Sequence, residues 1–117
     1  YGVGIHSEPG YRREKLQPSH DLVTEMAGKL DDEQHLSSDK HYGVLVNGMG
    51  ATPLMEQYIF THDLLNNLDK RNIKPVFTKV GNFMTSIDMA GISLTIFELA
   101  DPQWLDYLNY PVETIAW

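Results

Sequence analysis

The feature that most constrains this chain is a short apolar run that ends in a glycine-rich turn and leads directly into a long amphipathic segment. Residues 43–47 (Gly-Val-Leu-Val-Asn) are continuously apolar in their middle, which is typical of a strand that is central in a sheet or covered on both faces. Residues 48–53 then read Gly-Met-Gly-Ala-Thr-Pro. Thr52 suits a helix cap and Pro53 suits the first helical position. The pattern therefore predicts a strand followed closely by a helix.

This helix is predicted to run to about residue 71. Asn72 follows it and can adopt the left-handed backbone conformation that ends a helix. Apolar side chains recur at helical spacing, so one face is predicted to be buried, and each fully buried side chain contributes ~1.5–3 kcal/mol. The predicted buried face consists of Leu54, Met55, Tyr58, Ile59, Leu65 and Leu68.

An earlier helix is predicted to begin at Pro18 and Ser19, with Ser19 as its cap and Asp21 near its positive end. The polar residues 31–40 are expected to form a surface connection after it. The predicted buried face of this helix consists of Leu22, Val23, Met26, Ala27 and Leu30.

The remaining elements complete an α/β pattern. Strands are predicted at residues 2–6, 74–80 and 92–99, the last half-exposed, and a short helix from Asp101-Pro102 to Leu108. The 117 residues amount to one domain, residues 1–117. Because the chain is too short for helices on both faces of a large sheet, we expect a two-layer sandwich. In it, helices pack mainly on one face of a mixed β-sheet.

Charge and composition argue against several classes of partner. Sixteen Asp and Glu residues against nine Lys and Arg give a formal net charge of −7. Such a surface repels nucleic-acid phosphates and anionic lipid, so neither nucleic acid nor a membrane is an expected partner. The basic run Arg12-Arg13-Glu14-Lys15 is short and interrupted by an acid, and we interpret it as a solvated segment.

The location of the protein follows from similar arguments. The chain has no cysteine, which excludes disulfides and Cys-based metal sites and favours the cytoplasm. No apolar run approaches the ~20 residues that span a bilayer. Because the chain begins within a predicted strand and without Met, we expect it to be a domain of a longer polypeptide.

Three weaker candidates for chemistry have simpler interpretations. A glycine-rich helix entry can bind phosphate, but residues 48–53 lack the Gly-Lys-Ser/Thr of a P-loop, and Pro53 has no amide donor. We therefore interpret this turn as a tight connection. The histidines are not spaced as metal ligands, so no metal site is expected. Asp88 is interpreted as an acid that bonds local backbone amides rather than as a catalytic group.

His6 is the strongest candidate for a functional side chain. It ends the first predicted strand and directly precedes the turn signal Glu8-Pro9-Gly10. An imidazole held where a strand gives way to a loop is well placed to meet a ligand. A single histidine at such a place also often serves only to satisfy hydrogen bonds. The residues alone leave both interpretations open.

Three segments in their order along the chain carry a family resemblance. They are residues 4–10 (Gly-Ile-His-Ser-Glu-Pro-Gly) with Arg12-Arg13, residues 45–54 (Leu-Val-Asn-Gly-Met-Gly-Ala-Thr-Pro-Leu) and residues 85–91 (Thr-Ser-Ile-Asp-Met-Ala-Gly). Together they resemble the C-terminal half of the substrate-binding subunits of dihydroxyacetone kinases, the DhaK family. The resemblance covers essentially all 117 residues. Ser7 stands where the family usually has a glycine.

The resemblance implies a specific role for His6. In the family this histidine adds through a ring nitrogen to the carbonyl of dihydroxyacetone and holds it as a hemiaminal, so His6 would be a covalent tether rather than the base. A neutral imidazole, with an ordinary pKa of ~6.5, has a free lone pair at pH 7. Glycerol lacks a carbonyl and would be rejected. The tethered triose would be oriented for phosphorylation to dihydroxyacetone phosphate.

The resemblance also implies partners and a division of labour. No cofactor is expected in this domain, because the phosphoryl donor (ADP or ATP with Mg) sits on a partner subunit or domain. In the phosphotransferase-linked version the donor is an ADP-carrying DhaL-type subunit that is rephosphorylated ultimately from phosphoenolpyruvate. The family's acid/base His and Asp lie in the preceding domain, so the fragment alone is expected to be inactive. The family suggests a homodimer.

Other functions remain open beside this one. A dihydroxyacetone-sensing paralogue would capture the same triose on His6 and act as a transcriptional coactivator. A fatty-acid-binding protein of the related DegV family would need a long apolar tunnel and would have no use for His6. A purely structural module is the last alternative.

Overall fold

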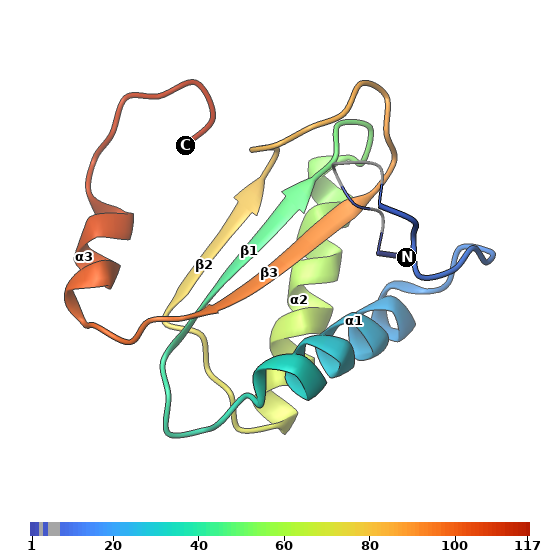
Figure 1. The fold of residues 1–117 in the computed structure, drawn as a ribbon. Coiled ribbons are helices and arrows are strands. Elements are labelled where there is room, and N and C mark those ends of the chain that lie inside the picture. Colours follow the sequence, from blue (N-terminus) through green and yellow to red (C-terminus); the bar gives the residue numbers. More distant parts are fainter. Residues whose placement is uncertain (3, 5–7) are drawn as a thin grey trace.

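The computed structural model describes residues 1–2, 4 and 8–117 of the chain. The described elements follow the order α1 (Ser19–Gln34), β1 (Tyr42–Gly48), α2 (Leu54–Lys70), β2 (Phe77–Gly81), β3 (Ile92–Glu98) and α3 (Gln103–Asn109), as Figure 1 shows. The strand, glycine-rich turn and long helix predicted from residue 43 onward are confirmed as β1 and α2.

The described strands form one mixed sheet in the order β2-β1-β3. β1 runs parallel to β2 and antiparallel to β3, so that Val44 lies opposite Thr78 on one side and Ile96 on the other. Every residue of β1 is buried except Leu45, which is half-buried. The prediction of a central, covered strand is therefore confirmed.

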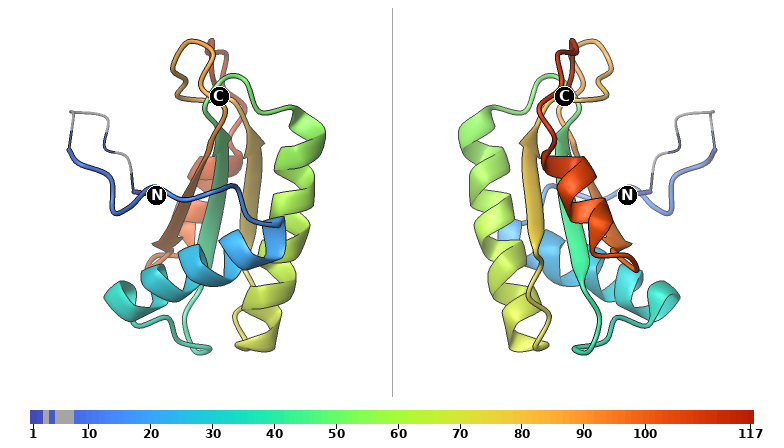
Figure 2. Two further views of the ribbon diagram at one scale, coloured as in Figure 1. Left: turned by 90° about the vertical axis from the view of Figure 1, so that its right-hand side faces the viewer. Right: turned by 90° about the vertical axis from the view of Figure 1, so that its left-hand side faces the viewer.

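The helices α1 and α2 cover one face of this sheet. Figure 2 shows α2 lying along the sheet. α1 crosses α2 near the C-terminal end of α2, where Asp31 forms an ion pair with Arg71 at 2.7 Å. Val44 and Val46 of β1 and Ile96 of β3 point toward the helices and are at most 3% exposed. The helices contribute Val23, Ala27, Phe60, Leu64 and Leu68 to the same core. The predicted two-layer α/β architecture is confirmed.

The buried face of α2 differs from the predicted one. Leu54, Met55, Tyr58 and Ile59 are between 49% and 69% exposed, and Leu65 is half-buried. Of the predicted face only Leu68 is buried. The helix instead buries Gln57, Phe60, Thr61, Leu64 and Leu68.

Hydrogen bonds explain why two polar side chains take the buried positions. Gln57 Nε2 donates to the Thr52 carbonyl oxygen at 3.0 Å and to Asn82 Oδ1 at 2.7 Å. Thr61 Oγ1 donates to the Gln57 carbonyl oxygen at 2.8 Å. Burying a polar group costs little when it is hydrogen-bonded, as these two donors are, whereas Gln57 Oε1 is buried without a partner in the described part of the chain. Because apolar residues occur on both sides of α2, hydrophobic spacing alone did not identify the buried side.

α1 begins where it was predicted to begin, but its cap and its C-terminal end differ from the prediction. Pro18 occupies the N-cap position, and the hydroxyl of Ser19 is buried without a partner in the described part of the chain, so the predicted cap is wrong. The helix continues through Gln34 and ends at His35, which has a φ of 52° and donates its N–H to the Asp31 carbonyl oxygen. Its predicted apolar face is confirmed: Val23 and Ala27 are buried, and Leu22, Met26 and Leu30 pack against the core.

The end of α2 follows the prediction. Asn72 has a φ of 60° and donates its N–H to the Asp69 carbonyl oxygen, while Ile73 donates to Leu68, both at 2.9 Å. These two bonds form a Schellman motif, in which a left-handed residue satisfies the last carbonyl groups of a helix. The motif turns Ile73 into the same core as Leu68.

The later elements lie within a few residues of their predicted positions. β2 begins at Phe77 rather than at residue 74, and β3 shows the predicted partial exposure. α3 has no buried residue. After α3 the chain returns to the sheet, where Trp117 stacks on Phe77 with 6.1 Å between ring centroids. Phe77 pairs with Gly43, on the face opposite Val44, so this segment covers part of the second face.

The first predicted strand lies largely outside the described residues, which omit residues 3 and 5–7. Gly2 and Gly4 are described and belong to no strand. Within the described part of the chain, no helix is long and apolar enough to cross a membrane.

Leu64→Ala should destabilise the 117-residue chain by about 2–5 kcal/mol, because Leu64 is fully buried between α2 and the sheet. Leu54→Ala makes the same chemical change on the same helix at a residue that is 51% exposed, and should change stability by no more than about 0.5 kcal/mol. Urea denaturation followed by circular dichroism measures both. Equal losses in the two variants would contradict the assignment of the buried face.

Candidate functional site

His6, the predicted covalent tether, lies outside the described residues, whereas residues on both sides of it are described and contact one another. Tyr11 donates its N–H to the Tyr1 carbonyl oxygen at 2.6 Å. The Arg12 guanidinium carbon lies 4.4 Å from the centroid of the Tyr1 ring, a cation–π contact. These contacts join the two ends of the segment that contains His6.

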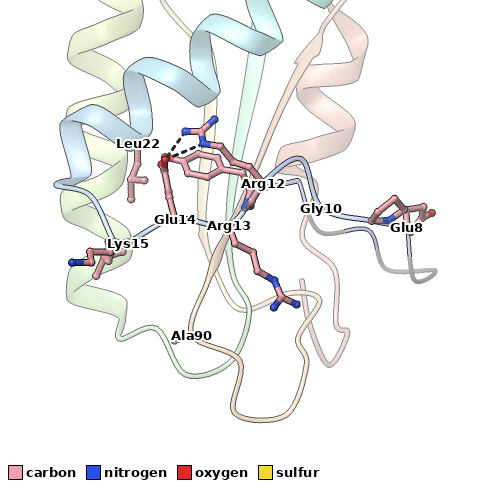
Figure 3. A pocket seen from close by; sticks show the side chains of 11 residues that line it. Glu8, Gly10, Arg12, Arg13, Glu14, Lys15, Leu22 and Ala90 are labelled. Atoms are coloured by element: carbon pink, nitrogen blue, oxygen red, sulfur yellow. Dashed lines mark hydrogen bonds and ion pairs between the residues drawn. The ribbon is translucent and has the colours of Figure 1, made fainter.

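An open hollow of about 780 Å³ lies beside this segment. Figure 3 shows the side chains that line it. Residues 8–10 and 12–16 line it together with Tyr1, Leu22 of α1 and Ala90. Ala90 belongs to residues 85–91, the third of the segments singled out in the sequence. The first and third segments therefore meet at one hollow, although about 80 residues separate them along the chain.

The second and third segments are joined by backbone hydrogen bonds. Met49, in the glycine-rich turn after β1, donates to the Gly91 carbonyl oxygen at 3.0 Å. Ala51 of the same turn donates to Met89 at 3.0 Å. These amides are engaged within the protein, which confirms the interpretation of the turn as a tight connection.

Thr52 fastens the same two segments rather than capping α2, so its predicted role is wrong. Its hydroxyl donates to the Gly91 carbonyl oxygen and accepts the Gly91 N–H, both at 2.9 Å. Pro53 takes the N-cap position of α2. Gly50 has a φ of 132°, and a Cβ there would lie 2.7 Å from the Ser86 carbonyl oxygen. The close approach of the two segments therefore requires glycine at this position.

Asn47, which has no predicted role, extends this set of contacts to Phe83 and Met84. Its Oδ1 accepts the N–H groups of Phe83 and Met84 at 2.8 and 2.9 Å, and its Nδ2 donates to the Met84 carbonyl oxygen at 2.7 Å. Asn47 is 7% exposed. The sequence does carry a signal for this role, because Asn47 is a polar residue at the end of an otherwise apolar strand.

Asp88 does not hold the loop in the predicted way. It is exposed, and within the described part of the chain its carboxylate accepts no hydrogen bond, so the predicted bonds to local amides are wrong. Asp88 shapes the loop through its backbone, which adopts a left-handed conformation with a φ of 53°.

The basic run at residues 12–15 is not uniformly solvated, which corrects the sequence-based interpretation. Arg12 donates to Glu14 through Nε at 2.9 Å and Nη2 at 2.8 Å, and it also donates to both carboxylate oxygens of Glu25 on α1. Hydrogen bonding to the guanidinium lowers the pKa of Glu25 and of Glu14 below the ordinary carboxyl value. Arg12 thereby ties the segment beside the hollow to α1.

Arg12→Gln should raise the pKa of Glu25 toward its ordinary value of 4.5, because the guanidinium that favours the ionised carboxylate is lost. In the unmodified protein this pairing contributes stability above that value and loses it as the pH falls through the lower pKa of the folded state. An NMR titration of the Glu25 carboxyl group measures the shift.

Arg13→Gln is the matched control for this titration. It removes the same charge from the next residue, which has no ion pair within the described part of the chain, and should leave the pKa of Glu25 low. A low Glu25 pKa that persists in Arg12→Gln would show that another group holds this carboxylate.

Comparisons with known proteins agree with these motifs. The Dak1 domain model matches residues 1–116. The dihydroxyacetone-binding subunit DhaK of a PTS-dependent dihydroxyacetone kinase from Lactococcus lactis is 61% identical over 117 residues, which cover 100% of this chain and 35% of that protein. The DhaKLM operon coactivator DhaQ from the same organism is 48% identical over 119 residues, covering 36% of its length.

Solved structures show the same relationship. The dihydroxyacetone kinase operon co-activator DhaQ matches with a TM-score of 0.85 and 49% identity, covering 94% of this chain and 34% of that one. The dihydroxyacetone kinase from C. freundii, solved with AMP-PNP and Mg²⁺, matches with a TM-score of 0.70 and 28% identity, covering 93% of this chain and 20% of that one. The chain thus spans about a third or less of these relatives.

The match to the family model includes all three sequence segments. In the structure, described residues of the first and third segments line one hollow, and hydrogen bonds join the second segment to the third. The chain therefore belongs to the Dak1 domain family.

Proposed function

We propose that this chain is the part of a dihydroxyacetone kinase that holds dihydroxyacetone covalently on His6 for phosphorylation. The observation that carries the proposal is the 61% identity, over the whole chain, to a dihydroxyacetone-binding subunit. The hollow lined by Glu8, Gly10 and Ala90 supports it, because these residues belong to the first and third family segments. The chain spans 35% of that relative, so the kinase activity of a whole protein is part of the proposal.

The proposed capture step needs only a neutral imidazole and a ketone. A ring nitrogen of His6 attacks the carbonyl carbon, a C–N bond forms and the C=O π bond opens. The carbonyl oxygen takes up a proton as the ring loses its other N–H proton, so no group leaves. The ordinary histidine pKa of ~6.5 leaves most of the ring neutral at pH 7. Fixing the triose in one orientation then favours phosphorylation of a terminal hydroxyl.

The phosphoryl donor belongs to a partner in this proposal. Relatives of this chain are named PTS-dependent dihydroxyacetone kinase subunits, which favours an ADP-carrying DhaL-type subunit recharged ultimately from phosphoenolpyruvate. A related kinase was solved with AMP-PNP and Mg²⁺, which supports a nucleotide and metal as donor elsewhere in the assembly. We assign no cofactor to this chain, an acid/base pair to the preceding domain, and a cytoplasmic homodimer to the whole protein.

A regulatory function is the second candidate. The coactivator DhaQ is 48% identical to this chain, and its structure matches with a TM-score of 0.85. In this alternative His6 captures dihydroxyacetone as a signal, and no phosphoryl group is transferred.

His6→Ala in the full-length protein should abolish the covalent adduct with dihydroxyacetone, because the attacking nitrogen is removed. Intact-protein mass spectrometry after incubation with the triose measures the adduct, and glycerol should give none. His20→Ala is the matched control, since it removes another imidazole whose side chain is 72% exposed. An adduct that persists in His6→Ala and disappears in His20→Ala would show that His20, and not His6, is the site of covalent attachment.

The kinase proposal and the coactivator alternative predict different reactions of the full-length protein. The kinase should form dihydroxyacetone phosphate when phosphoenolpyruvate, the phosphotransferase proteins and a DhaL-type subunit are supplied, and enzymatic assay of the triose phosphate measures it. Adduct formation without any product in this assay would favour the coactivator.

A further inference from the structure

Two cations beside the hollow have no acidic partner among the residues that the structure describes. Arg13 and Lys15 both line the hollow and are exposed, and within the described part of the chain neither forms an ion pair. Their neighbour Arg12 is different, because Glu14 and Glu25 hold its guanidinium. Adjacent arginines therefore have different roles: one anchors the segment, and the other is available to a ligand.

The side chains are arranged so that Arg13 faces away from the anchor. In the view of Figure 3, Arg12 points toward Glu14, whereas Arg13 extends from the opposite side of the chain. Glu8 and Lys15 lie at opposite ends of the group in this view, with Arg13 between them. Arg12 pairs with Glu25 of α1, and this pair holds the neighbouring backbone of Arg13 in place.

The local charge is opposite to that of the whole chain. The formal net charge is −7, whereas three cations and two acids line the hollow, and within the described residues Arg13 and Lys15 form no ion pair. A cationic spot on an acidic protein attracts anions to that place and leaves the rest of the surface repulsive. A guanidinium presents paired N–H donors that match the oxygens of phosphate.

We propose that Arg13, supported by Lys15, binds a phosphate group at the hollow. The inference rests on the proposed function, because a triose held by the segment that lines this hollow would gain a phosphate there. The same chemistry suits the phosphate ester of the product and a phosphate of the donor nucleotide. Arg13 is thus assigned to phosphate recognition, separate from the covalent capture of the ketone by His6.

The test uses the full-length protein that carries this domain and measures three quantities for each variant. Dihydroxyacetone phosphate and ADP are titrated separately by isothermal titration calorimetry, the latter in the presence of the DhaL-type subunit. The dihydroxyacetone adduct is measured by mass spectrometry. Arg13→Gln should weaken binding of at least one phosphate ligand on the order of 10-fold, because a charge-assisted hydrogen bond is lost. The adduct should remain.

Two further variants separate phosphate recognition from a general effect of charge. Lys70→Gln removes one positive charge at the end of α2, outside the hollow, and should leave both affinities unchanged. Arg13→Lys should retain part of the affinity, since it keeps the charge and loses the planar pair of donors. If Arg13→Gln loses more affinity for dihydroxyacetone phosphate than for ADP, the site binds the phosphate of the product. If it loses more affinity for ADP, the site binds a phosphate of the donor.

Unchanged affinity for both ligands in Arg13→Gln would overturn the inference, and so would an equal loss in Lys70→Gln. Failure of the proposed function gives a different result, because the unmodified protein would then form no adduct with dihydroxyacetone.

Discussion

The structure around the candidate site depends on the hydrogen bonds between the turn that follows β1 and the segment that precedes β3. Asn47 and Thr52 supply the side-chain part of this connection, and backbone amides of Met49 and Ala51 supply the rest. All of these groups sit at the end of the central strand, where a covered backbone needs partners. The connection holds residues 85–91 in place and so brings Ala90 to the hollow.

A second fixed point lies on the other side of the hollow. The Arg12 guanidinium joins the N-terminal segment to Glu25, on a helix whose opposite face is buried in the core through Val23 and Ala27. The hollow therefore lies between two parts of the chain that are each secured to the sheet and helix framework. Rigid support of this kind is what a binding segment on a loop requires.

The family contains kinase subunits and a coactivator, and the proposed division of labour suggests why one domain serves both. Capture of a ketone by an imidazole needs no nucleotide, metal or acid/base pair from this chain. Phosphoryl transfer needs groups that the proposal places elsewhere in the protein and on its partner. A protein can therefore keep the capture step for sensing while it loses the transfer step. The 48% identity to DhaQ and the 61% identity to DhaK are consistent with such a shared module.

From α1 to α3, the sequence by itself determined the order and type of the elements, and it also determined the family. Local signals sufficed for the apolar run of β1, the apolar face of α1 and the left-handed Asn72, because each depends on neighbours within one or two turns of chain. The motif segments are local as well, and their residue types carry the family membership. The prediction for His6 rests on the same kind of signal, a residue type in a motif.

Only the tertiary structure decided which side of α2 is buried and what the polar residues near the site do. Gln57 and Thr61 reach the core because acceptors there take the hydrogen bonds that they donate, such as Asn82, 25 residues after Gln57. Arg12 and Arg13 have the same chemistry in the sequence, yet Glu25 lies close enough to pair with Arg12. Hydrogen bonds and ion pairs depend on distances of about 3 Å between groups that are far apart in the chain, and folding alone sets those distances.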